Sequence, residues 1–377
     1  MAMKRVIVAG HLCVDITPAI PDNGPDGVQK VFSPGRLTRV GPANTHIGGT
    51  VANTGLAMKM LGVPVSLMGK TGADDLGRIV RNALEQHGAA EGLIVSPKVD
   101  TSYTIALAVP GADRIFLHHP GANDHFTGED IPEDALRGAA LFHFGYPPLM
   151  RTMYINRGEA LHALLLKARK AGCAVSLDMA AVDERSEAGQ ADWPAVLRGA
   201  LPLTDFFLPS AEELLFMLDR EKWRALSRKN AGRDLAETLN PERDLRPLAD
   251  TCLRLGARAV LIKCGAAGLY LKTAEAERLR EIPAALELNT KAWSGLELFE
   301  RAYRPEKTLS STGAGDTAIA AFLTAVLSGC SPEEAIRLSA AEGACCLTAY
   351  DALSGLLPLD RLREKIAAGW EKTEPVA

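Results

Sequence analysis

The sequence predicts an α/β fold in which helices cover both faces of a central, mostly parallel β-sheet. Short β-branched and aliphatic runs alternate with longer stretches of helical periodicity along most of the 377 residues. These runs are apolar at successive positions, as expected of strands that are buried on both faces. Because 47% of the chain is hydrophobic, it can bury one large core, and we expect a single domain over residues 1–377.

The predicted strands alternate with predicted helices. The strands are Val6–Ala9, Val65–Met68, Ala174–Asp178, Phe206–Leu208 and Ala259–Ile262. The helices are Ala52–Leu61, Asp75–His87, Glu159–Lys170, Ala211–Arg220 and Leu245–Leu255. Buried strands that alternate with helices in this way are typical of one parallel sheet.

Two regions interrupt this alternation, at about 13–46 and 100–123. The first is rich in Pro, Gly and Asn, and the second holds two segments of alternating polarity. Both are typical of hairpin strands outside the main sheet, so we expect a small β lid. Two further segments, 219–245 and 284–306, are expected to be surface insertions. The first is highly charged, and the second contains the aromatic residues Trp293, Phe299 and Tyr303.

Charge and cysteine content argue against several classes of protein. A formal net charge of −4 gives no basic footprint for nucleic acid. No apolar stretch is long enough to span a membrane, and His11 and Asp15 interrupt the apolar start that would otherwise imitate a signal peptide. The seven cysteines, an odd number without Cys-x-x-Cys spacing, are typical of core residues in a reduced, cytoplasmic protein.

The most informative segment is Ser311–Leu327. Its apolar residues recur at helical spacing, yet the predicted helix opens with Gly313 and Gly315, each of which costs about 1 kcal/mol inside a helix relative to alanine. Glycines at the positive end of a helix allow the oxygens of a phosphate group to approach free N–H groups. We therefore expect an anion site here, beside Asp316.

The position of Asp316 has two interpretations. A carboxylate beside a phosphate would repel it unless the carboxylate serves the nucleophile. One interpretation is therefore a general base that takes the proton of a substrate hydroxyl as the γ-phosphoryl group leaves ATP. The other is an aspartate that interacts with the helix dipole. Position alone leaves both open.

Four segments resemble motifs of one enzyme family. Thr312-Gly-Ala-Gly-Asp-Thr317 resembles the C-terminal signature of the ribokinase-like (PfkB) carbohydrate kinases. Val8-Ala-Gly-His-Leu-Cys-Val-Asp15 resembles their first strand, Gly48-Gly-Thr-Val-Ala-Asn53 their Gly-Gly signature, and Gly69-Lys-Thr-Gly-Ala-Asp-Asp-Leu-Gly77 their Gly-x-x-Gly-x-Asp-x-x-Gly segment. The motifs occur in the family's order and spacing, so the resemblance covers nearly the whole chain.

The resemblance implies a ribokinase-like fold and ATP-dependent phosphorylation of a hydroxyl group on a sugar or sugar-like molecule. It also implies that Asp316 is the general base. The other residues implied are Gly313, Ala314 and Gly315 as an anion hole for the transferring phosphate, and Asp15, Gly49 and Asn53 as partners of the substrate hydroxyls. Gly145 ends a predicted strand just before Tyr146, and we expect both at the sugar pocket.

On the nucleotide side the resemblance is partial. The segment Lys263–Gly268 resembles the family's Gly-x-x-Gly turn, which implies ATP contacts from Lys263, Gly265 and Gly268, although a plain hairpin turn has the same pattern. Ser210-Ala-Glu-Glu213 stands in place of the family's Asn-x-x-Glu motif. This implies that Ser210 borders ATP and that Glu213 holds Mg²⁺ through water, although a helix capping box has the same pattern. Magnesium is expected in either case, because phosphoryl transfer needs charge neutralised between the β- and γ-phosphates.

Other departures bear on the cation and the substrate. Ser310 stands six residues before Asp316, where many relatives have an Asp that helps to bind a monovalent cation, and this puts potassium activation in doubt. Thr50 replaces a Lys that sugar-phosphate kinases often have, which argues against a phosphorylated sugar. Asp178 lies at a predicted strand end, where it either faces the magnesium or caps the next loop.

The lid leaves several alternatives open. Its polar residues Arg114, His118 and His119 either recognise an acidic or heavily hydroxylated substrate or line the outside of a strand. Open lid edges need cover, and the resemblance implies a homodimer formed through the lid. A nucleoside kinase of the same fold is the alternative enzyme, with Phe116 and Tyr103 as candidate stacking residues. A non-catalytic sugar or nucleotide sensor is the alternative outside enzymes.

Overall fold

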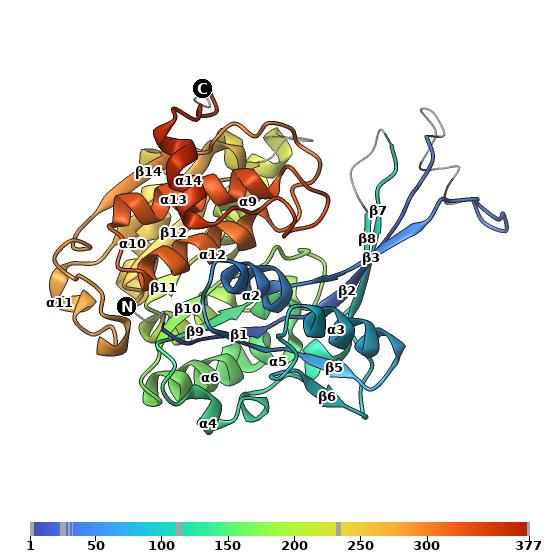
Figure 1. Ribbon diagram of the computed structural model, residues 1–377, viewed down its shortest axis with the longest axis horizontal. Coiled ribbons are helices and arrows are strands. Elements are labelled where there is room, and N and C mark those ends of the chain that lie inside the picture. The colour runs from blue at the N-terminus through green and yellow to red at the C-terminus, as the bar shows by residue number, and fades with distance from the viewer. Residues whose placement is uncertain are drawn as a thin grey trace.

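The computed structural model describes residues 4–22, 28, 31, 33–110, 115–230 and 235–374, without the side chains of residues 236 and 237. Within these residues the main sheet has eight strands (Figure 1). In spatial order they are β14 (Glu297–Arg301), β13 (Gly268–Thr273), β12 (Ala259–Lys263), β11 (Phe206–Phe207), β10 (Ala174–Leu177), β9 (Leu141–Gly145), β1 (Val6–Gly10) and β4 (Val65–Met68). Neighbouring strands are parallel from β4 to β12, and the pairs β12–β13 and β13–β14 are antiparallel. The predicted mostly parallel sheet is confirmed.

Helices cover both faces of this sheet. Successive side chains of a strand point to opposite faces, and those of β1 accordingly belong to two separate buried clusters, Val6 and Val8 to one, Ile7 and Ala9 to the other. The first cluster includes side chains of α2 (Thr50–Met60), α12 (Ala314–Leu327) and α13 (Pro332–Cys346), and the second those of α6 (Glu159–Lys170), α7 (Trp193–Ala200) and α8 (Ala211–Leu218). The other described helices are α3 (Asp75–Gln86), α4 (Glu133–Leu136), α5 (Arg151–Tyr154), α9 (Arg220–Lys229), α10 (Arg246–Leu255), α11 (Ala276–Leu279) and α14 (Leu359–Ala367). None of these helices is both long and apolar enough to cross a lipid bilayer.

The lid is a four-stranded sheet that projects from the main body (Figure 1). Its strands, in spatial order, are β3 (Ala43–Gly48), β2 (Cys13–Pro18), β7 (Tyr103–Leu107) and β8 (Ile115–His119). The β2–β3 ladder starts at Cys13↔Gly48 beside the main sheet and ends at Pro18↔Ala43. This confirms the expected strands outside the main sheet. Parts of both lid segments, 23–27, 29–30, 32 and 111–114, lie outside the described residues, and Arg114 is among them. A separate pair, β5 (Lys70–Gly72) and β6 (Ile94–Ser96), lies next to α3 (Figure 1).

The two expected insertions differ from each other in the structure. In 219–245 the described residues include α9, a helix without buried residues, but Leu235, Leu239 and Leu245 of the same segment lie in the core. The segment 284–306 is more than a surface insertion, because Glu297–Arg301 forms β14, the edge strand of the main sheet. Trp293 is 1% exposed and its ring packs edge-on against Phe206 and Phe322. β14 was not predicted from the sequence, because Glu297-Leu-Phe-Glu-Arg301 has neither a continuous apolar run nor an alternation of polar and apolar residues.

Candidate active site

The N-terminus of α12 has the backbone geometry that its glycines suggested. Gly313 is the N-cap residue and has φ 81°, a left-handed conformation that favours glycine. A Cβ atom on Gly313 would lie 2.3 Å from Cβ of Ala352, so glycine also allows the close approach of the segment that holds Ala352. The Ala314 N–H donates to the carbonyl of Ser311 at 3.3 Å. The structure therefore places the predicted anion hole, Gly313 to Gly315, at the positive end of a 14-residue helix.

Asp316 lies in the first turn of α12 and is 4% exposed. Its carboxylate accepts three side-chain donors. Asn53 Nδ2 lies 3.0 Å from Oδ2, Thr54 Oγ1 lies 3.2 Å from Oδ1, and the Tyr146 hydroxyl lies 2.8 Å from each oxygen. Burial raises the pKa of Asp316, while the hydrogen bonds from Asn53 and Tyr146 act against that shift. The result is a buried, oriented carboxylate with raised basicity.

Tyr146 reaches Asp316 through a strained backbone. It follows Gly145 at the end of β9 and has φ 66° and ψ 39°, which is uncommon for a residue other than glycine and costs on the order of 1–3 kcal/mol. Burial and the charge of Asp316 raise the pKa of the Tyr146 hydroxyl well above its usual value, so the hydroxyl stays protonated and donates. The sequence suggested Tyr146 only as a lining residue of the sugar pocket. Its position after the carboxyl end of a buried parallel strand was the available signal.

The Gly-Gly segment joins the lid to this carboxylate. Gly49 is the N-cap of α2 with φ 86°, and a Cβ atom there would lie 2.5 Å from both Nδ1 and the carbonyl oxygen of His11. A Cβ atom on Gly48 would lie 2.1 Å from Oδ2 of Asp15, and one on Gly145 would lie 2.3 Å from Oγ1 of Thr50. These glycines allow close approach between neighbouring protein segments. The structure thus brings the predicted substrate residues, Asp15, Gly49, Asn53 and Gly145, to the junction of lid and main sheet.

On the other side of Asp316 lies a buried ion pair. Lys263 ends β12, and its Nζ lies 2.5 Å from Oδ1 of Asp178, which follows β10. A Cβ atom on Gly315 would lie 3.9 Å from the same Nζ, so the ammonium group lies beside the first turn of α12. Burial lowers the pKa of Lys263, but the charges of Asp178 and Glu213 outweigh it and raise the pKa. Lys263 therefore stays protonated beside the predicted anion hole.

Glu213 and Ser210 form the capping box that was one of the two interpretations of their spacing. The Ser210 N–H donates to Oε2 of Glu213 at 2.6 Å, and the Glu213 N–H donates to Oγ of Ser210 at 3.2 Å. The charge of Glu213 also acts on Asp178 and Lys263, so Glu213 lies at the same site. Its role at magnesium stays a prediction.

The predicted nucleotide turn is a β-hairpin. Gly265 lies in the turn between β12 and β13 with φ 53°, and Gly268 is the first residue of β13 with φ 126°. A Cβ atom on Gly268 would lie 2.1 Å from the carbonyl oxygen of Glu300 on β14. Both glycines are therefore required by the turn and the sheet, and their contact with ATP stays a prediction. Ser310, at the doubtful cation position, accepts a hydrogen bond from the Thr312 N–H at 3.1 Å.

The described residues contain no group of three or more His, Cys, Asp or Glu side chains that could hold a metal ion by themselves. At this site the buried Oδ2 of Asp178 has no hydrogen-bond partner among those residues. Mg²⁺ bound with a nucleotide takes one or two protein carboxylates besides phosphate oxygens and waters. The donor set of Asp178 and Glu213 therefore fits a magnesium ion that arrives with ATP.

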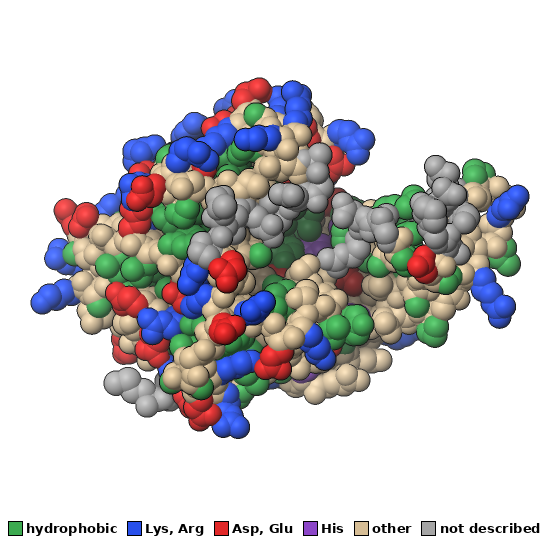
Figure 2. All heavy atoms as spheres, turned by 90° about the horizontal axis from the view of Figure 1, so that it is seen from above, with side chains coloured by type: hydrophobic (Ala, Val, Ile, Leu, Met, Phe, Trp, Pro, Cys, Tyr) green, Lys and Arg blue, Asp and Glu red, His purple; other side chains and the backbone are tan. Residues whose placement is uncertain are grey.

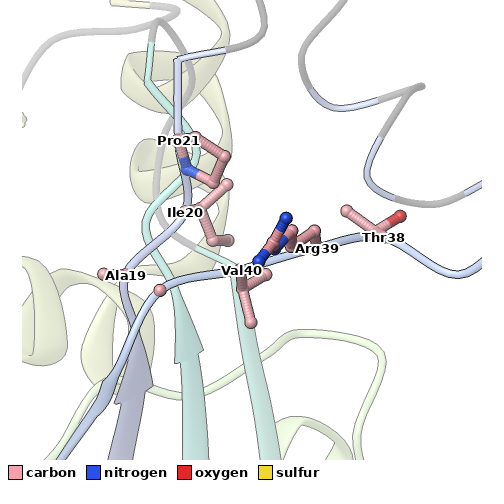
Figure 3. Close-up of a pocket in the computed structure, with 7 residues that line it drawn as sticks. Ala19, Ile20, Pro21, Thr38, Arg39 and Val40 are labelled. Carbon is pink, nitrogen blue, oxygen red and sulfur yellow. The ribbon is translucent and has the colours of Figure 1, made fainter.

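The surface around these residues is hollowed. Figure 2 shows a hollow between the main body and the lid, with histidine and acidic side chains at its bottom. A second depression lies within the lid, between the residues that follow β2 and those that precede β3 (Figure 3). Its lining is Ala19, Ile20, Pro21, Thr38, Arg39, Val40 and Gly41. It adjoins the end of the β2–β3 ladder remote from Gly48, and its lining has no carboxylate, so we place the site in the hollow.

Comparison with known proteins gives the family. The model of the pfkB family carbohydrate kinases matches residues 3–358. An uncharacterized sugar kinase of Archaeoglobus fulgidus is 24% identical over 301 residues, which cover 80% of this chain and 98% of that protein. The 2-dehydro-3-deoxygluconokinase of Bacillus subtilis is 22% identical over 339 residues, which cover 89% of this chain and 90% of that one.

Solved structures share the fold. Arabidopsis thaliana ribokinase, complexed with ribose and ATP, has a TM-score of 0.69 at 19% identity, with 96% of this chain and 98% of that chain covered. An E. coli protein in complex with ATP and Mg²⁺ has a TM-score of 0.69 at 20% identity, with 97% and 100% covered. The fold is therefore ribokinase-like, as the motifs implied. With a family match from residue 3 to residue 358, this chain belongs to the pfkB family of carbohydrate kinases, phosphotransferases that act on sugar hydroxyls.

Proposed function

We propose that this protein transfers the γ-phosphoryl group of ATP to a hydroxyl of a sugar-like acceptor, with Asp316 as the general base. The observation that carries the proposal is a buried carboxylate, held by Asn53, Thr54 and Tyr146, in the first turn of a helix whose N-terminus also faces a lysine ammonium. A group that accepts protons and an anion-binding helix end meet there within one helical turn. Phosphoryl transfer to an alcohol needs both.

The acceptor hydroxyl would be deprotonated at Asp316. A carboxylate has about four lone-pair sites, so Asp316 can accept the hydroxyl proton while Asn53 and Tyr146 continue to orient it. The proton moves to the carboxylate as the acceptor oxygen forms its bond to phosphorus and the bond to the ADP oxygen breaks. Burial raises the pKa of Asp316 and so increases its basicity for this step.

Positive charge for the transferring phosphoryl group would come from the chain itself as well as from the metal. Lys263 lies beside Gly315, and Asp178 fixes its ammonium group there. The N-terminus of α12 adds its partial positive charge on the same side. When bound with ATP, Mg²⁺ would neutralise charge between the β- and γ-phosphates. We propose that Asp178 and, through water, Glu213 hold it.

We also propose that the protein is a homodimer and that it resides in the cytoplasm. The lid strands β3 and β8 are the edges of a four-stranded sheet, and Phe116 and Leu117 on β8 are 58% and 50% exposed. In a homodimer, a second copy that covers these edges would pair the open strand edges and bury the exposed apolar side chains. None of the seven cysteines, all of which lie within the described residues, forms a disulfide bond, which agrees with a reducing compartment such as the cytoplasm.

The experiment that tests the proposed function is ATP turnover across a panel of acceptors. Purified protein with ATP and Mg²⁺ is screened for ADP release against sugars, polyols, sugar acids and nucleosides, and each hit is confirmed by the mass of the phosphorylated product. We expect acceptor-dependent ADP release together with a product that is heavier by one phosphoryl group. Tight ATP binding without transfer to any member of the panel would contradict the proposal and favour a sensor.

A further inference from the structure

His11 connects the main sheet to the lid, and its backbone is hydrogen-bonded both to the end of β9 and to the start of α2. It lies between β1 and β2, and its backbone N–H donates to the carbonyl of Gly145 at 3.3 Å. Its own carbonyl accepts from the Val51 N–H, in the first turn of α2, at 3.2 Å. The backbone of His11 is thus fixed between the strand end that precedes Tyr146 and the helix that carries Asn53.

The ring of His11 lies one side chain away from the proposed base. Its centroid is 5.9 Å from the ring of Tyr146, whose hydroxyl donates to Asp316. On another side, the ring of His118 from lid strand β8 is 5.5 Å away. His11 therefore bridges the residues around the base and the lid.

The hydrogen bonding of His11 differs from that of the second fully buried histidine, His143. His143 uses both ring nitrogens, since Nε2 lies 3.3 Å from Oγ1 of Thr50 and Nδ1 lies 3.0 Å from Oγ of Ser176. His11 is 2% exposed, and neither of its ring nitrogens has a hydrogen-bond partner among the described residues. A buried polar atom that is left unpaired destabilises the folded protein. Hydrogen bonds within the fold therefore satisfy both ring nitrogens of His143, whereas the fold leaves both ring nitrogens of His11 without a partner among the described residues.

The charges around His11 suit hydroxyl groups. Burial lowers the pKa of His11 to about 3, so its ring is neutral and offers one donor and one acceptor. Burial also lowers the pKa of His118. The charged groups that act on His118 and on Tyr146 include the carboxylates of Asp124 and Asp316. The cation that acts on Asp316, Lys263, already binds Asp178. A hydroxyl both donates and accepts, whereas an acceptor carboxylate would face like charge.

We propose that His11 hydrogen-bonds a hydroxyl of the acceptor and, with His118 on the lid, selects an uncharged, polyhydroxylated acceptor over the carboxylate of the same skeleton. The proposal rests on the proposed function for the location of the acceptor, and it adds the substrate class and a specificity-determining residue. His118 already lies beside His11, with ring centroids 5.5 Å apart, so both rings can contact the same ligand. Nδ1 of His11 faces Gly49, so the ring nitrogen that would gain a partner from the acceptor is Nε2.

The test uses matched pairs of compounds that differ only in –CH₂OH against –COO⁻, such as D-glucose with D-glucuronate and D-glucitol with D-gluconate, besides D-ribose and D-fructose. Binding is measured calorimetrically on the full chain without ATP, for the wild type, His11→Phe and His11→Gln. We expect at least one uncharged compound to bind the wild type at least about tenfold more tightly than its acid does. Its affinity should fall by about tenfold or more in His11→Phe. The affinity should recover in part in His11→Gln, because Gln keeps a donor and an acceptor. Absence of binding by every uncharged compound, preference for the acids, or unchanged affinity in His11→Phe would overturn the proposal.

His143→Phe is the matched control for a purely structural histidine. It leaves Thr50 and Ser176 without their partner, so its midpoint of thermal unfolding should fall. That of His11→Phe should stay or rise, because two unpaired polar atoms are removed. A fall in His11→Phe as large as in His143→Phe would contradict the proposal. The two proposals can fail separately. Sugar binding that depends on His11 without any phosphoryl transfer would contradict only the proposed kinase reaction. Phosphoryl transfer with an unchanged acceptor KM in His11→Phe would contradict only the proposed role of His11.

Discussion

The two sides of the site are built from different chemistry. On the acceptor side, Asp316 is surrounded by uncharged donors, the amide of Asn53 and the hydroxyls of Thr54 and Tyr146. On the nucleotide side, full charges meet, because the Lys263 ammonium binds the Asp178 carboxylate and Glu213 acts on both. A general base must accept a proton, and uncharged donors can orient its carboxylate without a fixed counter-ion beside it. A phosphoryl group carries negative charge, which positively charged groups must balance.

The origin of the two sides differs as well. The acceptor side is assembled from the lid junction, α2, the end of β9 and α12, which lie far apart in the sequence and meet through glycines. The nucleotide side comes from the ends of the neighbouring parallel strands β10, β11 and β12. Ligands commonly bind at the carboxyl ends of such strands. We therefore expect substitutions on the two sides to affect different kinetic constants.

Among substitutions of the residues around Asp316, the largest effect is expected from Lys263→Met, which removes the charge and keeps an apolar side chain of similar length. We expect kcat to fall roughly 10²- to 10³-fold, with the acceptor KM nearly unchanged, since the ammonium acts on the transferring phosphate. The control is Lys272→Met, because Lys272 is similarly buried and pairs with Asp250, without a contact to Asp178. Equal losses in the two variants, or a loss confined to the acceptor KM, would break the assignment of Lys263 to the nucleotide side. The measurement is steady-state ADP release at varied ATP and acceptor.

A smaller effect is expected from Tyr146→Phe, which removes one hydroxyl that donates to Asp316. Loss of a hydrogen bond to a charged group is worth about 1.5–3 kcal/mol, so we expect kcat/KM to fall about 10- to 100-fold. The hydrogen bond from Tyr146 acts to lower the pKa of Asp316. In the variant that pKa rises, and the acid limb of the pH profile of kcat/KM should move to higher pH.

Tyr154→Phe is the control for that profile, since Tyr154 packs against Trp193 and does not donate to Asp316. Its acid limb should coincide with that of the wild type. If the acid limb of Tyr146→Phe also stays in place, or moves to lower pH, Asp316 is not the group that titrates in the reaction.

The smallest effect is expected from Glu213→Gln, and it separates the two roles of Glu213. The Gln side chain can still accept from the Ser210 N–H, so the capping box and the stability should be kept. Loss of the charge should raise the Mg²⁺ concentration needed for half-maximal activity by about tenfold. Ser210→Ala is the converse control, with stability lower by about 1 kcal/mol and little change in the Mg²⁺ requirement. An unchanged Mg²⁺ requirement in Glu213→Gln would leave only the capping role.

Much of the acceptor side could be predicted from the sequence, because glycines carry strong constraints. Gly49 permits the close approach that was one interpretation of its motif, and both Gly313 and Gly49 have left-handed φ values. Asn53, predicted as a partner of the substrate hydroxyls, contacts Asp316. Tyr146 was predicted only as a lining residue. Its contact with Asp316 depends on a backbone conformation at φ 66° that no local sequence preference indicates.

The nucleotide side was less predictable, because its residues have ordinary structural explanations. Ser210 and Glu213 fit a capping box, Gly265 and Gly268 fit a hairpin, and the structure contains both. The Lys263–Asp178 pair could not be found from spacing, since it depends on β10 and β12 lying on either side of β11. Sheet order is a tertiary property. β14 was mistaken for part of a surface insertion because Glu297–Arg301 has no strand pattern of its own, and it is recognised as a strand only by its pairing with β13.

The proposed role of Asp316 is tested most directly by a single-turnover measurement on Asp316→Asn. Enzyme in excess over ATP is mixed with Mg²⁺ and saturating acceptor and quenched at intervals, while the affinities for ATP and acceptor are measured separately. Asn keeps the shape of the side chain and removes the proton-accepting carboxylate. We predict that the rate of product formation falls about 10²- to 10⁴-fold while both affinities change little. A rate within a few fold of the wild type at unchanged affinities would contradict the account.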